Sequence, residues 1–255
     1  MIPYIYFPHF SVGPLTIQVW GLMVALGFLI GATVSARMIK KQGLDAVMLW
    51  DLLVWILIAS MVGARLFHIL FYEPSYYFAH PFEIMAIWNG GMSSMGGFAG
   101  AVIASIWFLR RRHVDVWKYA DAAIFGLPLG YGIGRIGCFF IHDHPGTATD
   151  FFLGIRYPDG MIRHDLGLYL FLNGFLLFAI FLLLVKYRVR QGMYLVTFLL
   201  WYGISRFFLD FLRATSGPIV DTRYLFLTPA QYASLGMITY GCFLFWKFRQ
   251  KKTEP

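Results

Sequence analysis

Charged residues are scarce in this chain of 255 residues: 13% are Asp, Glu, Lys or Arg, whereas 59% are hydrophobic and 19% are aromatic. Soluble domains carry roughly 25% charged residues, so this composition excludes an ordinary soluble protein and favours lipid as the solvent. Cysteine is also rare, and Cys138 in a polar loop and Cys242 in an apolar run predict no disulfide framework. The N-terminal stretch has no basic residues before its first apolar run and no small-residue cleavage site after it, which favours a first helix retained as an anchor.

Long apolar runs are abundant. A helix needs about 20 apolar residues to cross a bilayer, and runs of that length bounded by charge, Pro or Gly occur throughout the chain. They predict an all-α, polytopic membrane protein with about seven transmembrane helices and a single integral domain over residues 1–255. The predicted spans are 16–36, 46–71, 91–109, 119–139, 166–185, 192–211 and 228–246.

The net charge of +8 is explained by orientation in a membrane. Lys and Arg residues lie at the ends of apolar runs, which is the pattern that sets membrane topology, and no nucleic-acid partner is expected. Fourteen of the 21 basic residues fall after the first, third, fifth and seventh runs: Arg37, Lys40, Lys41, Arg110, Arg111, Arg112, Lys118, Lys186, Arg188, Arg190, Lys247, Arg249, Lys251 and Lys252. The N-terminus is therefore predicted outside and the C-terminus in the cytoplasm. The longer polar loops, 72–89, 140–165 and 213–229, then face outward, and we expect any chemistry there.

Apart from Asp51, which is expected at the cytoplasmic interface near the start of its span, five charged residues lie inside predicted spans, where a charge destabilises by a few kcal/mol or more unless it is paired or hydrated. They are Arg65, Asp121, Arg135, Arg206 and Asp210. Arg206 and Asp210 are spaced i,i+4 on one helix, and a purely structural ion pair is the alternative to a functional role. Arg213 extends the same face. Arg135 follows the glycines of LPLGYGIGRIG, where a planar guanidinium fork suits a phosphodiester, the alternative being simple neutralisation by Asp121.

Two loop segments carry further candidates. In CFFIHDHPG, His142 or His144 could accept a proton and Asp143 could orient either one, unless these side chains merely face water. A metal site of Cys138 with both histidines has an incomplete ligand set, so no metal is expected. In WNGGMSSMGG, backbone amides around Ser93 could hold a lipid headgroup, or the glycines could simply form a tight turn at a helix start.

The order of motifs resembles the bacterial prolipoprotein diacylglyceryl transferase family over nearly the whole chain. The matching pieces are VWGLMVALGF, GARLFHILFY, WNGGMSSMGG, Asp121 with LPLGYGIGRIG, RHDLGLY and YGISRFFLDFLR. The resemblance implies an enzyme, without a cofactor, that moves the diacylglyceryl group of phosphatidylglycerol onto the lipobox cysteine thiol of a prolipoprotein signal peptide and releases glycerol phosphate. It also implies a multi-pass protein of the bacterial cytoplasmic (inner) membrane, with its site toward the outer face of the bilayer.

The same resemblance implies roles for individual residues. Arg135 and Arg206 take the places of the arginines that hold the phosphate. With His142, Asp143 and His144, which are suggested by the residues themselves and not by the family, they are the catalytic candidates. The remaining substrate-binding candidates are Tyr202, Asp210, Arg213, Asn89, Gly90, Gly91, Ser93, Gly96, Gly97, Gly146 and His164.

The sequence departs from the family pattern where a proton must be removed. Met95 stands where the family has a histidine, Cys138 and Ile141 replace two asparagines, and Leu170 replaces a glutamate; Trp20 replaces a tyrosine. We hypothesise that His142 or His144 supplies the missing base. The alternatives are a divergent relative that binds phospholipid or transfers its group to another acceptor, and, from another class, a small-solute transporter, although no repeated halves are visible.

Overall fold

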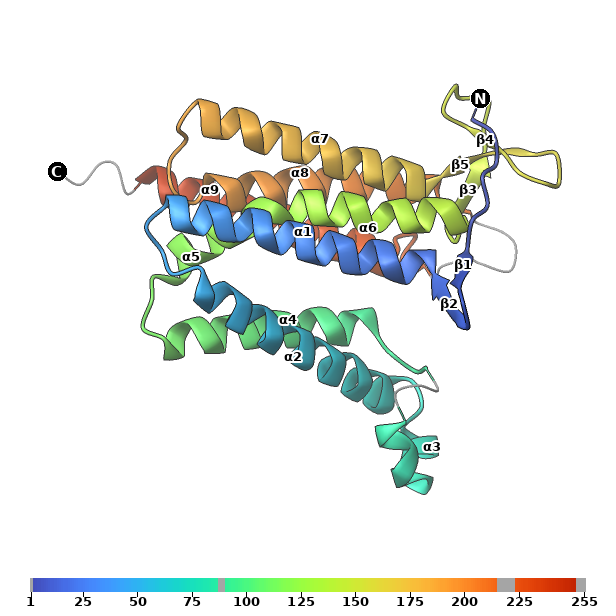
Figure 1. The fold of residues 1–255 in the computed structure, drawn as a ribbon, viewed down its shortest axis with the longest axis horizontal. Helices are drawn as coiled ribbons and strands as arrows, with labels where there is room; N and C mark the ends of the chain where they lie inside the picture. The colour runs from blue at the N-terminus through green and yellow to red at the C-terminus, as the bar shows by residue number, and fades with distance from the viewer. Residues whose placement is uncertain (1, 87–89, 215–222, 251–255) are drawn as a thin grey trace. The chain divides into compact units, whose positions relative to one another are not determined.

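Seven long helices make up most of the protein in this computed structural model, which describes residues 2–86, 90–214 and 223–250 (Figure 1). Each occupies one of the seven predicted spans. They are α1 (Val19–Lys41), α2 (Val47–Phe71), α4 (Ser94–Arg111), α6 (Leu127–Ile141), α7 (Leu166–Lys186), α8 (Met193–Leu209) and α9 (Pro229–Gln250). Shorter helices, α3 (Pro74–Ala79) and α5 (Val116–Ala123), and the 3₁₀ turns η1 (Pro81–Met85), η3 (Ile124–Gly126) and η4 (Asp210–Leu212) complete the helical part.

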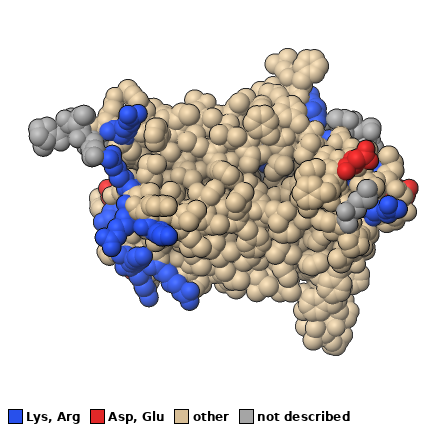
Figure 2. Space-filling model, turned by 90° about the horizontal axis from the view of Figure 1, so that it is seen from above, with Lys and Arg blue, Asp and Glu red and all other residues tan. Residues whose placement is uncertain are grey.

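Five of the described helical segments are long and apolar enough to cross a membrane. They are Val19–Lys41, Val47–Phe71, Val116–Ile141, Leu166–Lys186 and Met193–Leu212. The expected class, a helical multi-pass membrane protein, is therefore confirmed, while the count of seven spans stays a prediction. The helix flanks visible in Figure 2 are almost free of charged side chains, as expected for surfaces that face lipid.

Small β-sheets add a feature that the sequence analysis did not anticipate. The strands β1 (His9–Val12) and β2 (Leu15–Gln18) form an antiparallel hairpin. The strands β3 (Pro145–Ala148), β4 (Ile155–Arg156) and β5 (Ile162–Asp165) form a sheet in the order β3-β5-β4. These strands have two to four residues, too few to give a clear alternating pattern in the sequence.

The chain divides into two compact units: Met1–Met38 with Ala120–Pro255, and Ile39–Tyr119. In the larger unit, α1 and α6 are antiparallel and approach through glycines. A Cβ atom at Gly126 would lie 1.9 Å from Gly31 O, one at Gly130 would lie 2.5 Å from Gly27 O, and one at Gly137 would lie 2.9 Å from Trp20 Cα. Small residues thus let these helix backbones approach closely, as is common in membranes.

The smaller unit is built on the α2–α4 pair, which uses the same device. A Cβ atom at Gly96 would lie 2.2 Å from Gly63 O, and one at Gly100 would lie 2.2 Å from Ala59 O. At the Arg110 end of α4, Arg112 pairs with Asp51 at 3.4 Å between Nη2 and Oδ2, and both side chains are half exposed. Such an exposed pair contributes little stability, so the glycine-mediated contact is what holds α2 against α4.

Asp121 caps the start of α8. Its Oδ1 accepts a hydrogen bond from the Leu195 N–H at 2.9 Å. Along the continuous helical segment Val116–Ile141, Asp121 precedes Arg135 by 14 residues, which corresponds to about 20 Å at 1.5 Å per residue. Neutralisation of Arg135 by Asp121, the alternative raised by the sequence, is therefore wrong.

Candidate active site

Arg206 and Asp210 are the centre of a buried polar cluster in the larger unit. The helical i,i+4 spacing places Arg206 Nη2 2.9 Å from Asp210 Oδ1, and the Asp210 side chain is fully buried. Arg213, which follows η4, brings Nη1 to 3.9 Å from the same oxygen. One carboxylate oxygen thus faces two guanidinium groups. Within the described residues, Arg206 Nη1 is buried and has no hydrogen-bond acceptor.

The other oxygen of Asp210 is held from the start of α9. Asp210 Oδ2 accepts a hydrogen bond from the Thr228 hydroxyl. Thr228 is in turn the N-cap of a capping box, because its Oγ1 accepts from Gln231 N at 3.2 Å and its own N–H donates to Gln231 Oε1 at 2.9 Å. The sequence analysis missed this support, although Thr-x-x-Gln before an apolar run is its recognisable signal.

Arg135 reaches the cluster from α6. Its Cζ atom lies 5.1 Å from the centre of the Tyr131 ring, one turn earlier on the same helix, and its Nη1 lies 3.7 Å from Cys138 Sγ. The Tyr131 ring packs edge-on against Tyr202 of α8 at 5.4 Å between centroids. Cys138 is buried within α6, so its expected position in a polar loop is wrong. Tyr131 was not singled out from the sequence, although its i,i+4 spacing to Arg135 is visible there.

The three arginines share one electrostatic environment. Burial lowers the pKa of the Arg213 guanidinium, and the positive charges of Arg206 and Arg135 lower it further, while Asp210 and Asp143 act in the opposite direction. Three cations therefore face two carboxylates in a poorly hydrated place. An additional anion would relieve this repulsion, and the planar guanidinium fork favours a phosphate or carboxylate.

Gly146 is placed where the chain must pass closest to Arg213. An antiparallel bridge joins Gly146 to Arg213, and Thr147 Oγ1 lies 3.5 Å from Leu212 O. A Cβ atom at Gly146 would lie 2.4 Å from Leu212 O and 2.9 Å from His164 Cβ. Gly146 therefore joins β3 to the arginine cluster through backbone contact, which is how it can influence substrate.

His142 is a buried histidine whose two ring nitrogens are already engaged. Nδ1 lies 2.7 Å from Asp165 Oδ2 and Nε2 lies 3.2 Å from Ile5 O, with only 1% of the side chain exposed. The ring also stacks on Tyr4 at 4.1 Å, and the residue ends α6 in the left-handed conformation. This position fastens the N-terminal segment to β5 and leaves no nitrogen to accept a substrate proton.

Asp143 and His144 lie next to it but are more open. His144 Nδ1 lies 3.1 Å from Asp143 Oδ1, and the two side chains are 27% and 30% exposed. Neither His144 Nδ1 nor Asp143 Oδ1 has a hydrogen-bond partner within the described part of the chain, so the 3.1 Å contact is not a hydrogen bond. Of the two histidines considered from the sequence, His144 alone lies beside a carboxylate with a ring nitrogen that makes no hydrogen bond among the described residues.

His164 lies on β5, beside the same bridge. Its Nδ1 is 2.7 Å from the Tyr169 hydroxyl of α7. Burial lowers the pKa of His164 below its ordinary value of 6.5. A neutral imidazole that accepts a hydrogen bond from the Tyr169 hydroxyl fits both observations. His164 therefore orients Tyr169 and β5 beside Gly146.

The glycine-rich candidates of the smaller unit have different surroundings. Asn89 lies outside the described residues. Gly96 and Gly97 lie within α4 and face α2, where a Cβ atom at Gly97 would lie 3.5 Å from Ser60 O. Ser93 is the N-cap residue of α4, makes no side-chain cap bond, and donates its backbone N–H to Ala64 O at 3.0 Å. The carbonyl oxygens of Gly90 and Gly91 accept hydrogen bonds from Arg65 Nη1 at 2.5 and 3.0 Å.

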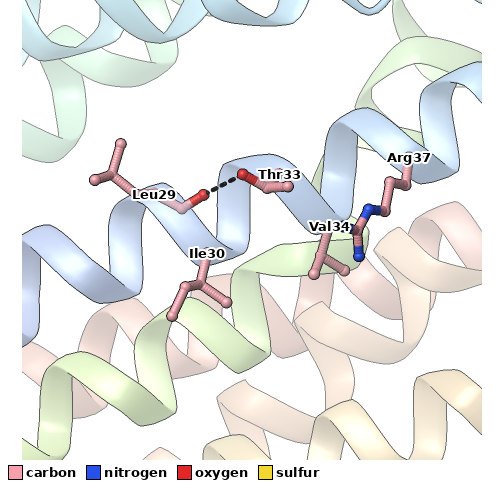
Figure 3. A pocket seen from close by; sticks show the side chains of 5 residues that line it. All are labelled: Leu29, Ile30, Thr33, Val34 and Arg37. Atoms are coloured by element: carbon pink, nitrogen blue, oxygen red, sulfur yellow. Dashed lines mark hydrogen bonds between the residues drawn. The ribbon is translucent and has the colours of Figure 1, made fainter.

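A shallow cavity of about 270 Å³ on α1 carries no comparable chemistry. It is lined by Leu29, Ile30, Thr33, Val34 and Arg37, and the Thr33 hydroxyl donates to Leu29 O at 2.8 Å (Figure 3). Because Gly137 packs at Trp20 and Gly126 at Gly31, Arg37 lies toward the opposite end of α1 from the level of Arg135. Among the described residues no group of three His, Cys, Asp or Glu side chains is arranged to hold a metal ion.

Helices long enough to cross a membrane several times, with a buried arginine cluster beside a small β-sheet in the larger unit, define a polytopic membrane protein with a built polar site. A family model described as prolipoprotein diacylglyceryl transferase matches residues 8–247. The chain belongs to this family.

Curated relatives agree with this assignment, and those that follow are all named phosphatidylglycerol–prolipoprotein diacylglyceryl transferase. The protein of Nitrosomonas europaea is 37% identical over 246 residues, covering 94% of this chain and 88% of the relative. That of Aromatoleum aromaticum is 37% identical over 257 residues, covering 96% and 95%. That of Bacillus velezensis is 34% identical over 218 residues, covering 81% and 80%.

Proposed function

We propose that this chain transfers the diacylglyceryl group of phosphatidylglycerol to the lipobox cysteine thiol of a prolipoprotein signal peptide. Family membership and the names of its relatives support this reaction. The observation that carries the proposal within the structure is the cluster of Arg135, Arg206 and Arg213, in which the buried Arg206 Nη1 has no acceptor within the described residues. A phosphodiester supplies the oxygen atoms that such donors need.

The reaction substitutes sulfur for oxygen at one glyceryl carbon. The thiolate of the acceptor forms the new C–S bond while the C–O bond to the phosphate breaks, so the products are a thioether-linked lipid and glycerol phosphate. Negative charge develops on the departing phosphate oxygen. Fixed guanidinium groups at that position stabilise the transition state more than the ground state, and this lowers the barrier.

The acceptor thiol must lose its proton, because the thiolate is the nucleophile. We assign this role to His144, since its Nδ1 lies 3.1 Å from Asp143 Oδ1 and has no hydrogen-bond partner within the described residues. His142 is given a structural role because both of its ring nitrogens are bonded. This arrangement would supply a base in a chain that carries Met95 where the family has a histidine.

The proposed location is the bacterial cytoplasmic (inner) membrane, with the site toward its outer face. Basic residues occupy the last turns of α1, α4, α7 and α9, which supports placing those helix ends in the cytoplasm. The N-terminus, the β-sheets and the arginine cluster are then on the outer side, where a prolipoprotein emerges from the membrane.

Purified protein in phosphatidylglycerol-containing micelles should attach a diacylglyceryl group to a synthetic lipobox peptide, which is detected as a mass increase. Mild alkali should remove the ester-linked acyl chains and leave the thioether-linked glyceryl group on the cysteine. A peptide with Ser in place of the lipobox Cys is the control. Absence of product from folded protein would refute the proposed reaction.

The assignment of the base is tested separately. His144→Ala should reduce transfer by about 10²-fold or more, as expected for loss of a general base. The matched control His113→Ala changes a histidine between α4 and α5 that takes no part in the polar cluster. Transfer by His144→Ala at the wild-type rate would remove the role of His144.

A further inference from the structure

The Tyr131 hydroxyl is a buried polar group without a partner. Buried polar groups are normally bonded within the protein, and the guanidinium of Arg65, for example, donates all five of its N–H groups to backbone carbonyls between residues 83 and 91. By contrast, the oxygen atom of Tyr131 is buried and makes no hydrogen bond within the described residues. A hydroxyl in that condition destabilises a protein, so its presence requires a physical reason.

Tyr131 lies on α6, on the same face of the helix as Arg135. The two residues are spaced i,i+4, and Arg135 Cζ lies 5.1 Å from the centre of the Tyr131 ring, within the range of a cation–π contact. Such a contact uses the face of the ring. It therefore holds Tyr131 in place without occupying its hydroxyl.

A matching pair lies opposite, on α8. Tyr202 and Arg206 have the same i,i+4 spacing, and the Tyr202 ring packs edge-on against Tyr131 at 5.4 Å between centroids. The helices α6 and α8 run in the same direction, because α7, which connects them, runs antiparallel to both (Figure 1). Arg135 and Arg206 therefore each follow the tyrosine contact by one helical turn, on the same side of it.

The surroundings of the Tyr131 hydroxyl are positively charged. The charges of Arg135 and Arg206 both act on it, and the Tyr202 hydroxyl lies near it without the geometry of a hydrogen bond. Arg206 Nη1 is a second buried donor that has no acceptor within the described residues. Two unused donors among positive charges suit an anionic group that carries several oxygen atoms.

We propose that the Tyr131 hydroxyl is a further substrate contact, which donates a hydrogen bond to a phosphate oxygen of the lipid held between Arg135 and Arg206. The proposal rests on the proposed function and adds a neutral donor to its cationic site. A hydroxyl bonded to an ionised oxygen makes a short, strong hydrogen bond, and a neutral phenol adds nothing to the repulsion among the arginines. The donor is then unsatisfied in the protein alone and satisfied when the lipid binds.

The variant Tyr131→Phe removes only the hydroxyl and keeps the ring that packs on Arg135 and Tyr202. Transfer to a lipobox peptide is measured while the mole fraction of phosphatidylglycerol in mixed micelles is varied. We expect kcat/KM for the lipid to fall by about tenfold or more, as for the loss of a hydrogen bond to a charged group. Wild-type kcat/KM in this variant would overturn the proposal.

The unfolding temperature in detergent without phosphatidylglycerol distinguishes a substrate contact from a structural one. Because the hydroxyl has no protein partner, Tyr131→Phe should unfold at or above the wild-type temperature. The matched control Tyr119→Phe removes a hydroxyl that donates to Asp45 O at 3.0 Å, so it should unfold at a lower temperature and keep the wild-type kcat/KM. A lowered unfolding temperature for Tyr131→Phe, or its failure to fold, would identify a structural hydroxyl and overturn the proposal.

Binding without turnover separates the contact from the proposed reaction. In the absence of peptide, phosphatidylglycerol should raise the unfolding temperature of the wild type more than that of Tyr131→Phe. If the wild type transfers nothing, the proposed function fails, and this difference still tests the contact. Equal shifts in the two proteins would overturn the contact, as would an equally large shift of the wild type by inorganic phosphate, which would assign the hydroxyl to a free anion.

Discussion

Arg206 and Asp210 form an ion pair of 2.9 Å in which neither side chain has all of its polar atoms hydrogen-bonded. Asp210 is completely buried, lies near a second cation at Arg213 and accepts from Thr228 through Oδ2, but its Oδ1 and Arg206 Nη1 make no hydrogen bond in the described part of the chain. In a purely structural ion pair, the polar atoms of both side chains would be expected to have hydrogen-bond partners. The proposed role of Arg206 in binding an anionic substrate group uses this unpartnered Nη1 donor.

Replacing Arg206 by Lys should lower kcat for diacylglyceryl transfer by about 10²- to 10³-fold, because lysine keeps the charge but loses the planar fork. The measurement is the initial rate with a lipobox peptide at saturating phosphatidylglycerol. Arg163→Lys is the control, since Arg163 pairs with Asp159 in an i,i+4 contact at the end of the β-sheet. Equal rates in the two variants would show that Arg206 does not act on the leaving phosphate.

Thr228→Val should destabilise the protein. The hydroxyl both caps α9 and donates to the buried Asp210, so its loss removes a cap worth about 1 kcal/mol and leaves a carboxylate oxygen short of a donor, at about 1–3 kcal/mol. Thermal unfolding in detergent should show a lower midpoint. Thr239→Val, on the same helix, loses only a bond to Leu235 O and should unfold near the wild-type temperature.

Gly126→Ala should disturb the packing of α1 on η3 and α6. The added methyl group would lie 1.9 Å from Gly31 O and 2.7 Å from Ser35 Oγ, so backbone must move, at about 1–3 kcal/mol. Gly236→Ala, in α9, meets nothing within 4 Å and should be neutral or slightly stabilising. Similar unfolding temperatures for the two variants would contradict the close helix approach.

The stability of the three-stranded β-sheet that contains β5 should fall as the pH drops below about 6.5. Burial lowers the pKa of His164, so in this range the unfolded chain binds more protons than the folded one, and protonation favours unfolding. The unfolding midpoint should therefore decline between pH 7 and pH 5 more steeply in the wild type than in His164→Gln. Parallel pH profiles would exclude His164 as the titrating group.

Some of the site was accessible from local sequence pattern and some was not. The i,i+4 spacing of Arg206 and Asp210 and the Arg135 motif were readable, because helix geometry fixes which neighbours face one another. The different roles of His142 and His144 were not readable from the sequence. The two residues are two positions apart, but contacts with residues distant in the sequence give them different surroundings. Asp165 and Ile5 occupy both ring nitrogens of His142, and neither partner could be inferred from CFFIHDHPG.

The membrane environment, the approximate limits of the seven long helices and the charge at their ends follow from the amino-acid sequence alone, because apolar length and the placement of Lys and Arg are local properties. Tertiary structure decided which polar groups are satisfied. Arg65 and Arg206 look alike in the sequence, yet one has all five donors bound by loop carbonyls and the other keeps a donor for a ligand. That difference arises from backbone atoms brought together across the fold, and hydrogen bonds of this kind leave no pattern in side-chain order.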